Sequence, residues 1–111
     1  ISNKIVKVIN EIKDNFSDKL SIKELADLIN ISESSLYQNF KTITSMSPLQ
    51  FQKKLRLEEA KQLLLGRNIE IAEVAYIVGY ESPSQFSREF SRMFGTSPKA
   101  FILSNKIEQT A

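Results

Sequence analysis

Residues 71–98 read IAEVAYIVGYESPSQFSREFSRMFGTSP, and the pattern of this stretch occurs twice in the chain. Residues 22–30 read IKELADLIN and have Ile, Glu and Ala at the same places as the first nine residues of the later stretch. Each nine-residue segment is followed by spaced apolar residues and a Ser-Pro pair, which are Leu36, Phe40, Ile43 and Ser47-Pro48 in the first copy and Phe86, Phe90, Met93 and Ser97-Pro98 in the second. An internal repeat of about 27 residues indicates a duplicated supersecondary unit.

Each copy predicts a helix-turn-helix. Three or four residues separate the two apolar-periodic segments of a copy, which is the length of a sharp turn between two helices. Ala26 and Ala75 stand where the helices have to approach closely. Asn30 and Gly79 stand in the turns, and both tolerate the left-handed backbone that such a turn requires. Two helix pairs that only pack a core are the alternative interpretation, and the duplication argues against it.

Helical spacing of apolar residues continues almost from end to end, and no segment alternates as a strand does. Serines that can cap a first turn precede most of the expected helices, and they are Ser21, Ser32, Ser47, Ser82 and Ser97. Gly66, Gly79 and Gly95 are expected to end the fourth, fifth and sixth helices. The fold class is therefore all-α with seven helices, of which the seventh is short and is followed by a frayed tail at residues 105–111. The apolar stripes of the expected helices include Ile5, Val8, Ile9, Ile12, Phe16, Leu25, Ala26, Leu28, Ile29, Leu36, Phe40, Ile43, Phe86, Phe90, Met93 and Phe94.

Residues 48–65 are predicted to form a long helix that connects a first subdomain of about residues 1–47 to a second of about residues 66–104. Its apolar residues lie on two sides of a helical wheel, with Leu49, Leu57, Ala60, Leu63 and Leu64 on one side and Phe51, Leu55 and Leu65 on the other. A helix that is apolar on both sides is held by two bodies. At about 1.5 Å per residue, this helix extends roughly 27 Å.

The composition of the 111 residues restricts the available chemistry. The chain has no Cys, His or Trp, which removes thiol catalysis, disulfides, His-based acid–base chemistry and metal sites built on Cys or His. Its three glycines are too far apart to form a phosphate-binding loop. No apolar run approaches the roughly 20 residues needed to span a bilayer. We therefore expect no enzyme, no metal, no cofactor and no membrane association.

The formal net charge of +2 is too small to indicate a nucleic-acid partner, so the position of the charges has to decide. Residues 49–70 carry five basic and three acidic side chains, and we expect Lys53 and Lys54 in this segment to contact a phosphate backbone. Residues 20–48 carry a net charge of −1. Non-specific affinity for DNA is therefore expected to be modest and to be weakened strongly by salt.

The second helix of the later copy has a polar face opposite its apolar stripe. At about 100° per residue, this face carries Ser84, Gln85, Arg88, Ser91 and Arg92, and Glu89 flanks it. Arg can bind guanine and Gln can bind adenine through paired hydrogen bonds, each pair giving about 1–3 kcal/mol of discrimination. An ordinary solvated face is the alternative. It is disfavoured because Arg88 has Ser84, not an acid, four residues before it.

The second helix of the first copy gives a weaker signal of the same kind. Its polar face carries Ser34, Gln38 and Lys41, of which Gln38 is the best base reader and Lys41 a phosphate contact. Tyr37 lies at the edge, where it either contacts DNA or is half-buried in the core. Amides at the helix starts capped by Ser32 and Ser82 are further candidates to bind phosphate. If the connecting helix places both faces about 34 Å apart, they match one turn of DNA.

Residues 71–101, IAEVAYIVGYESPSQFSREFSRMFGTSPKAF, closely resemble the signature of the AraC/XylS family of bacterial transcription regulators, and residues 46–64 are similar to that family's connecting helix. The resemblance implies tandem, homeodomain-like helix-turn-helix subdomains whose second helices enter successive major grooves of double-stranded DNA. It places base contacts at Ser34, Tyr37, Gln38, Ser84, Gln85, Ser87 and Arg88. We expect phosphate contacts at Ser32, Lys41, Lys53, Lys54, Ser82, Ser91 and Arg92.

Two positions depart from the family pattern: Ile102 stands where members often have Arg, and Glu70 stands where the fifth helix usually starts with Ser or Thr. The resemblance implies a cytoplasmic regulator with a separate sensing or dimerisation domain, and the first residue, Ile1 in place of Met, is consistent with a fragment of such a protein. RNA polymerase is a further expected partner. The alternative function is a helical protein-interaction module without direct DNA readout.

Overall fold

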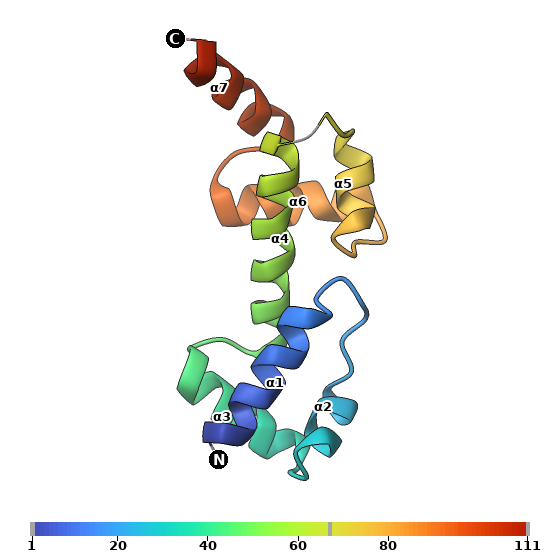
Figure 1. Ribbon diagram of the computed structural model, residues 1–111, viewed down its shortest axis with the longest axis vertical. Helices are drawn as coiled ribbons and strands as arrows, with labels where there is room; N and C mark the ends of the chain where they lie inside the picture. The colour runs from blue at the N-terminus through green and yellow to red at the C-terminus, as the bar shows by residue number, and fades with distance from the viewer. Residues whose placement is uncertain (1, 67, 111) are drawn as a thin grey trace. The chain divides into compact units, whose positions relative to one another are not determined.

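The computed structural model describes residues 2–66 and 68–110, with side chains described up to residue 106. The described residues form seven α-helices and no strand (Figure 1), which confirms the all-α prediction. The helices are α1 (Ser2–Asp14), α2 (Ile22–Leu28), α3 (Glu33–Thr44), α4 (Pro48–Gly66), α5 (Ile71–Ile77), α6 (Pro83–Phe94) and α7 (Pro98–Thr110). Within this described part, no helix is both long and apolar enough to cross a bilayer.

The chain forms two compact units, Ile1–Leu55 and Arg56–Ala111, and the boundary between them falls inside α4. This helix supplies side chains to both cores: Phe51 and Leu55 pack against that of unit 1, and Leu57, Ala60 and Leu64 are buried in that of unit 2. The two-sided apolar pattern of the helix thus corresponds to two separate cores.

The core of unit 1 is made by α1, α2 and α3. Its buried side chains are Ile5, Val8, Ile12, Leu25, Ala26, Ile29, Leu36 and Phe40. Gln52 of α4, only 4% exposed, donates hydrogen bonds from Nε2 to the carbonyl oxygens of Phe16 (3.1 Å) and Asp18 (2.8 Å). This buried amide attaches the loop after α1 to α4, and both bonds satisfy groups that burial would otherwise leave without water.

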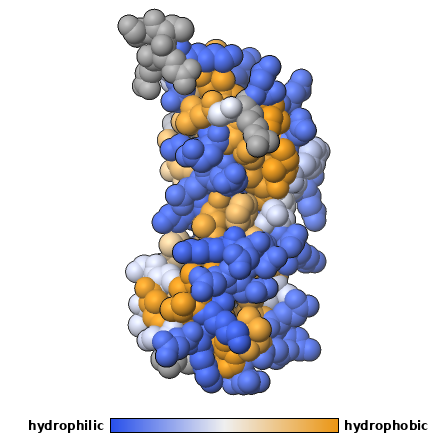
Figure 2. All heavy atoms as spheres, viewed as in Figure 1, coloured by the Kyte–Doolittle hydropathy of each residue, from blue (hydrophilic) through white to orange (hydrophobic). Residues whose placement is uncertain are grey.

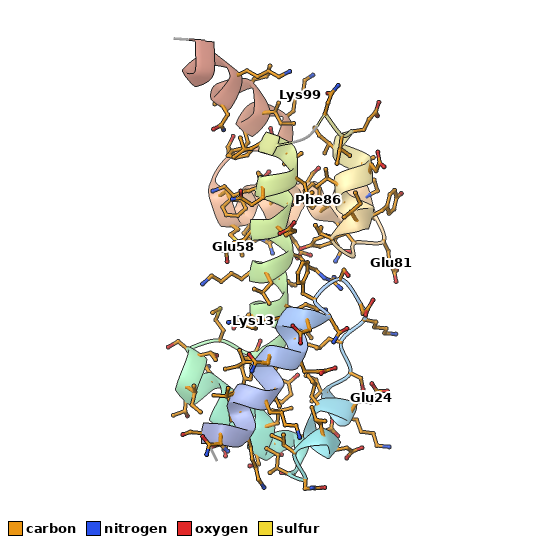
Figure 3. The ribbon with its side chains drawn as sticks, viewed as in Figure 1. Lys13, Glu24, Glu58, Glu81, Phe86 and Lys99 are labelled. Carbon is orange, nitrogen blue, oxygen red and sulfur yellow. The ribbon has the colours of Figure 1, made fainter. Side chains whose placement is uncertain are left out.

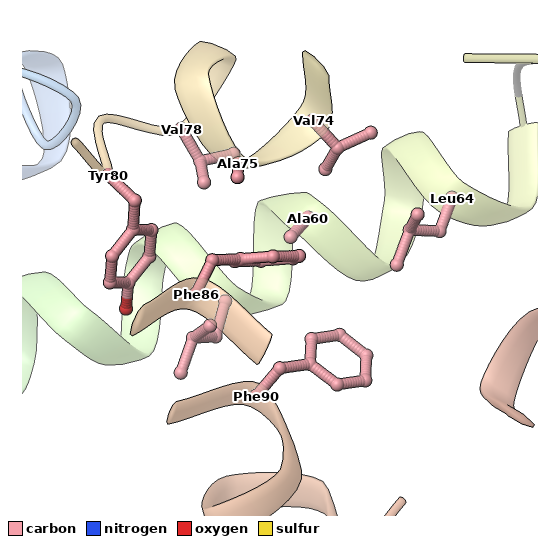
Figure 4. Packing of buried hydrophobic residues seen from close by; sticks show 9 residues of the cluster. Ala60, Leu64, Val74, Ala75, Val78, Tyr80, Phe86 and Phe90 are labelled. Carbon is pink, nitrogen blue, oxygen red and sulfur yellow. The ribbon is translucent and has the colours of Figure 1, made fainter. Parts of the chain in front are cut away.

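The core of unit 2 is aromatic (Figure 4). Phe86 and Phe90 of α6 are fully buried, and their ring centroids lie 5.7 Å apart. Phe90 also contacts the rings of Phe94 (4.7 Å) and Phe101 (5.7 Å) edge-on, which is a favoured geometry for aromatic pairs. Ile102, where the family often has Arg, is half-buried and packs against this core. The inner face of α6 is thus fixed by α5, α4 and α7.

The turns of the two copies have the same hydrogen bonds. In the first, Asn30 has φ 55° and the N–H of Ile31 donates to the carbonyl of Ala26 at 3.1 Å. In the second, Gly79 has φ 108° and the N–H of Tyr80 donates to the carbonyl of Ala75 at 2.9 Å. The prediction of left-handed residues at both turns is confirmed. In Figure 1, the axis of α6 crosses that of α5 at a large angle.

The serine caps also form as the sequence predicts. Each cap hydroxyl accepts from a backbone N–H in the first turn, for Ser21 from Glu24, for Ser32 from Ser35, for Ser47 from Gln50, for Ser82 from Gln85 and for Ser97 from Ala100. Glu70 makes no such side-chain bond to α5, in keeping with its poor capping chemistry.

Five apolar residues expected to pack are exposed, so the prediction is wrong for Leu28 (40%), Ile43 (44%), Leu49 (43%), Leu65 (41%) and Met93 (42%). Each lies at or next to the end of its helix, where neighbouring elements no longer cover the apolar stripe. Figure 2 shows hydrophobic residues among hydrophilic ones on one face of the molecule.

Helix α7 is longer than the sequence indicates. It has 13 residues and continues to Thr110, whereas a short helix and a frayed tail from residue 105 were expected. No Gly or Pro follows Pro98 to end the helix. Within it, Asn105 donates from Nδ2 to the carbonyl of Phe101 at 2.8 Å.

Candidate nucleic-acid interface

The outward face of α6 carries the residues that the sequence predicts to read bases in the second copy. Ser84, Gln85 and Arg88 are exposed, and Ser87 is half-buried. Their orientation follows from burial of Phe86 and Phe90 on the opposite side of the helix. Among the predicted phosphate contacts on this helix, Arg92 is exposed and Ser91 is half-buried. The helix therefore presents two guanidinium groups, an amide and hydroxyls, which are the groups that bind base edges and phosphates.

The start of α6 is built to hold this face in place. Pro83 occupies the first turn, and the hydroxyl of Ser82 accepts from the N–H of Gln85 at 3.3 Å. Proline has the backbone angle of a helix and lacks an N–H that would otherwise need a partner there. At the other end, Gly95 has φ 73°, and its N–H donates to the carbonyl of Ser91 at 2.8 Å. Ser82 is thus a structural cap whose hydroxyl hydrogen remains able to donate to a phosphate.

A polar network lies at the edge of the α6 face, and sequence reasoning did not find it. The hydroxyl of Tyr80 donates to Oε1 of Glu89 at 3.0 Å, and Nε2 of Gln85 donates to Oε2 of the same carboxylate at 3.0 Å. Burial, together with the adjacent Glu89 carboxylate, raises the pKa of Tyr80 well above its usual value, so the hydroxyl stays protonated as a donor. The spacing of Gln85 and Glu89 by four residues was the available signal. Nothing in the sequence signalled that the Tyr80 side chain packs beside α6.

The outward face of α3 holds the corresponding residues of the first copy. Ser34, Tyr37, Gln38 and Lys41 are all exposed. Tyr37 is 41% exposed and does not belong to the core of unit 1, which decides between the two readings of this side chain in favour of the surface. The structure thus brings these four side chains together on one helix face.

Helix α3 is capped by a serine as α6 is, but its charges differ from those of α6. Ser32 caps α3 by accepting from the N–H of Ser35 at 3.1 Å. Lys41 is the basic residue in the last turn, and Glu33 lies in the first turn. In α6 the first turn contains no acid. Of the two helices, α6 is the better match to a polyanion.

The two lysines of α4 that were predicted to contact phosphates belong to unit 1. Lys54 is exposed and Lys53 is half-buried. Both lie one turn or less from Phe51 and Leu55, whose packing fixes the helix. Their ammonium groups add positive charge to a unit whose α3 face has little.

The described residues offer little to other kinds of ligand. No group of three or more acidic residues in this part of the chain has the arrangement of a metal site. A hollow of about 260 Å³ in unit 1 is open to solvent and lined by Glu11, Asp18 and Glu24, among other residues. Three carboxylates against one lysine, Lys19, give this hollow a net negative lining, which is unsuited to a nucleic acid.

Comparison with known proteins agrees with this geometry. Residues 25–103 match the family model described as a helix-turn-helix domain. The raffinose operon transcriptional regulatory protein RafR of Pediococcus pentosaceus is 38% identical over 93 residues, which cover 84% of this chain and 34% of that protein. The chain spans 30% to 39% of the length of the first three curated relatives that it matches.

Solved structures show the same fold. The C-terminal domain of AraT, a response regulator from Geobacillus stearothermophilus, is 28% identical, with a TM-score of 0.85 over 91% of this chain and 84% of that one. The DNA-binding domain of AdpA, a global transcriptional factor solved in complex with a target DNA, is 24% identical, with a TM-score of 0.88 over 96% of each chain. At this level of identity the second likeness concerns the fold alone.

Proposed function

This chain belongs to the AraC/XylS-type helix-turn-helix family, and we propose that it is the sequence-specific, double-stranded DNA-binding domain of a bacterial transcription regulator. The observation that carries the proposal is the outward face of α6, where Ser84, Gln85, Arg88 and Arg92 are exposed above a fully buried aromatic stripe. A face made of donors and acceptors on a rigidly held helix is what the major groove requires, because each base pair presents a distinct pattern of acceptors and donors there.

The division of labour between residues follows from their chemistry. Arg88 binds guanine O6 and N7 through two hydrogen bonds, and Gln85 binds the edge of a neighbouring base. Arg92, Ser91, Ser82, Ser32, Lys41, Lys53 and Lys54 contact phosphates, which orient the domain without reading sequence. In unit 1, Gln38 is the principal base reader, with Ser34 and Tyr37 beside it. Ser87, half-buried, contacts a base only at the margin of the α6 face.

Each unit reads its own stretch of major groove, and the two stretches are successive. The proposal is supported by the duplication of the helix pair, whose turns share their left-handed residue and their hydrogen bonds. Sites separated by about one helical turn of 10–10.5 base pairs lie on the same side of the duplex. Insertion of about half a turn between the two half-sites should therefore abolish simultaneous binding.

The rest of the regulator lies outside this chain in the proposal. A separate sensing or dimerisation domain is supported by the short span of the curated relatives that the chain covers. RNA polymerase is a further partner, and the side chains of Tyr76 (57% exposed) and Ile77 (46% exposed) on α5 favour such a protein contact. The domain itself works by binding, without catalysis or cofactor, in the cytoplasm.

A salt titration tests the proposal against a module that binds only protein. The domain is titrated with a fluorescent duplex of random sequence between 50 and 200 mM salt. Four predicted phosphate-contacting cations, Lys41, Lys53, Lys54 and Arg92, give an expected slope of log K against log salt of about −3.6. An absence of binding at 50 mM salt, or a slope near zero, would contradict DNA binding.

A further inference from the structure

We propose that Glu89 is a positioning residue that fixes the side-chain amide of Gln85 and thereby selects the class of base that α6 accepts. The inference rests on the DNA-binding function proposed above. In this inference the half-buried Glu89 does not itself face the bases, but it controls which base the exposed Gln85 prefers.

Glu89 is held from the interior of unit 2. The hydroxyl of Tyr80 donates to Glu89 Oε1 at 3.0 Å. Tyr80 is only 5% exposed, and its ring packs against Phe86 with centroids 5.6 Å apart (Figure 4). The guanidinium carbon of Arg56 lies 5.5 Å from the centre of the same ring, at a cation–π distance. The tyrosine is therefore fixed by the core, and it fixes one oxygen of the carboxylate.

The other carboxylate oxygen fixes Gln85. Nε2 of Gln85 donates to Glu89 Oε2 at 3.0 Å, four residues along the same helix. A carboxylate accepts hydrogen bonds and donates none, so only the NH₂ end of the amide can face Glu89. The reversed amide orientation would bring Gln85 Oε1 against Oε2 without a proton between them. Glu89 thus excludes one of the two orientations that a free glutamine samples.

The fixed orientation determines what Gln85 presents to a ligand. Its carbonyl oxygen, Oε1, accepts no hydrogen bond from the described residues, and one hydrogen on Nε2 remains. Adenine and cytosine have an amino group on the major-groove edge, whereas guanine and thymine have only acceptors and, in thymine, a methyl group. An outward acceptor favours adenine, which also has N7 to accept the remaining Nε2 hydrogen, and then cytosine. We therefore expect α6 to discriminate against guanine and thymine at this position.

The first copy lacks this device, which shows that it is not a consequence of the fold. By the repeat, Ser35 and Asn39 correspond to Gln85 and Glu89. Nδ2 of Asn39 donates to the carbonyl oxygen of Ser35 at 2.8 Å and to its hydroxyl at 3.2 Å, so this amide is turned towards its own helix. The anchored acid–amide pair belongs to α6.

The experiment measures base preference and not affinity alone. A duplex selected by the wild-type domain is remade with each of the four bases at every position, and Gln85→Ala identifies the position at which preference is lost. Glu89→Ala is then compared with Glu81→Ala, which removes the same charge from an exposed residue of the preceding loop, away from the core around Phe86 (Figure 3). Removal of either acid raises affinity for all duplexes, because repulsion from phosphates falls. Only the ratio between bases reports positioning.

At that position we expect Glu89→Ala to reduce the preference for adenine over guanine at least about threefold, which is a part of the roughly 5- to 150-fold discrimination that a good side-chain–base pair contributes. Glu81→Ala should leave the ratio unchanged. Tyr80→Phe keeps the buried ring and removes only the hydroxyl, so it should reduce the same ratio by a smaller factor. In the Gln85→Ala background, Glu89→Ala should have no further effect on the ratio.

The outcomes separate this inference from the proposed function. If Gln85→Ala removes a base preference that Glu89→Ala and Tyr80→Phe both retain, the positioning role is refuted and DNA reading by α6 stands. If the wild-type domain prefers no sequence, the proposed function fails. If Glu89→Ala does not fold, the comparison of Tyr80→Phe with the wild type decides, and an unchanged ratio overturns the inference.

Discussion

Substitution of Arg88 by alanine should weaken specific DNA binding without affecting the fold. Arg88 is exposed and follows Gln85 by one turn of α6, while Phe86 and Phe90 hold the opposite face. Removal of its side chain changes no core contact, so stability should stay within about 0.5 kcal/mol of the wild type. Loss of a two-bond contact to guanine costs about 1–3 kcal/mol, which raises the Kd for the selected site roughly 5- to 150-fold.

The assay is fluorescence anisotropy with the selected duplex, with variants of that duplex at each base pair, and with a random duplex, all at one salt concentration. Arg88→Lys is the matched control, because it keeps the charge and loses the paired hydrogen-bond geometry. Both variants should lose preference at one and the same base pair. Arg92→Ala should instead weaken binding to all duplexes alike and reduce the salt slope by about 1. If Arg88→Ala binds the selected duplex as tightly as the wild type does, α6 does not read that site through Arg88.

Four further variants test the fold and the charge assignments. Ser45 and Gly95 occupy the same left-handed position after α3 and α6, with φ 66° and 73°. In urea unfolding, Ser45→Gly should raise the free energy of unfolding of the domain by about 1 kcal/mol, and Gly95→Ser should lower it by a similar amount. Effects of the same sign for both variants would refute backbone strain at Ser45. Phe90→Ala should lower the free energy of unfolding by about 3–5 kcal/mol, because the ring is fully buried among three others; a loss below about 1 kcal/mol would mean that the core is not packed as described. Lys54→Ala should lower the salt slope by about 1 for every duplex, and a loss confined to one sequence would contradict its assignment to phosphate.

Local chemistry explains why the elements could be predicted from sequence. The turn residues Asn30 and Gly79 are among the few that adopt positive φ readily, and each was found in that conformation. Serine caps are equally local, because the hydroxyl binds an N–H only two or three residues away. The repeat then predicted that both copies have the same turn. The equivalent hydrogen bonds from the N–H of Ile31 to the carbonyl of Ala26 and from the N–H of Tyr80 to the carbonyl of Ala75 confirm it.

Features that depend on distant segments could not be read in the same way. Gln52 looks like a surface residue of a helix, yet its amide is buried because it bonds carbonyls of Phe16 and Asp18, more than thirty positions earlier. In the sequence, Glu89 is only an acid at the edge of the predicted face. Its hydrogen bond from the hydroxyl of Tyr80 depends on the path of the loop between α5 and α6. Periodicity also overestimated burial at helix ends, as Met93 shows. A stripe records which residues are apolar and not how far the neighbouring elements extend.

Selection of bound duplexes from a random pool, with the wild-type domain and with Arg88→Ala, shows whether the exposed face of α6 above its aromatic core reads base sequence. The wild type should enrich a site with two blocks about one helical turn apart. Arg88→Ala should retain one block and lose preference for at least one base pair in the other. A pool that stays random after repeated selection, or identical enriched sites for both proteins, would contradict base reading by α6.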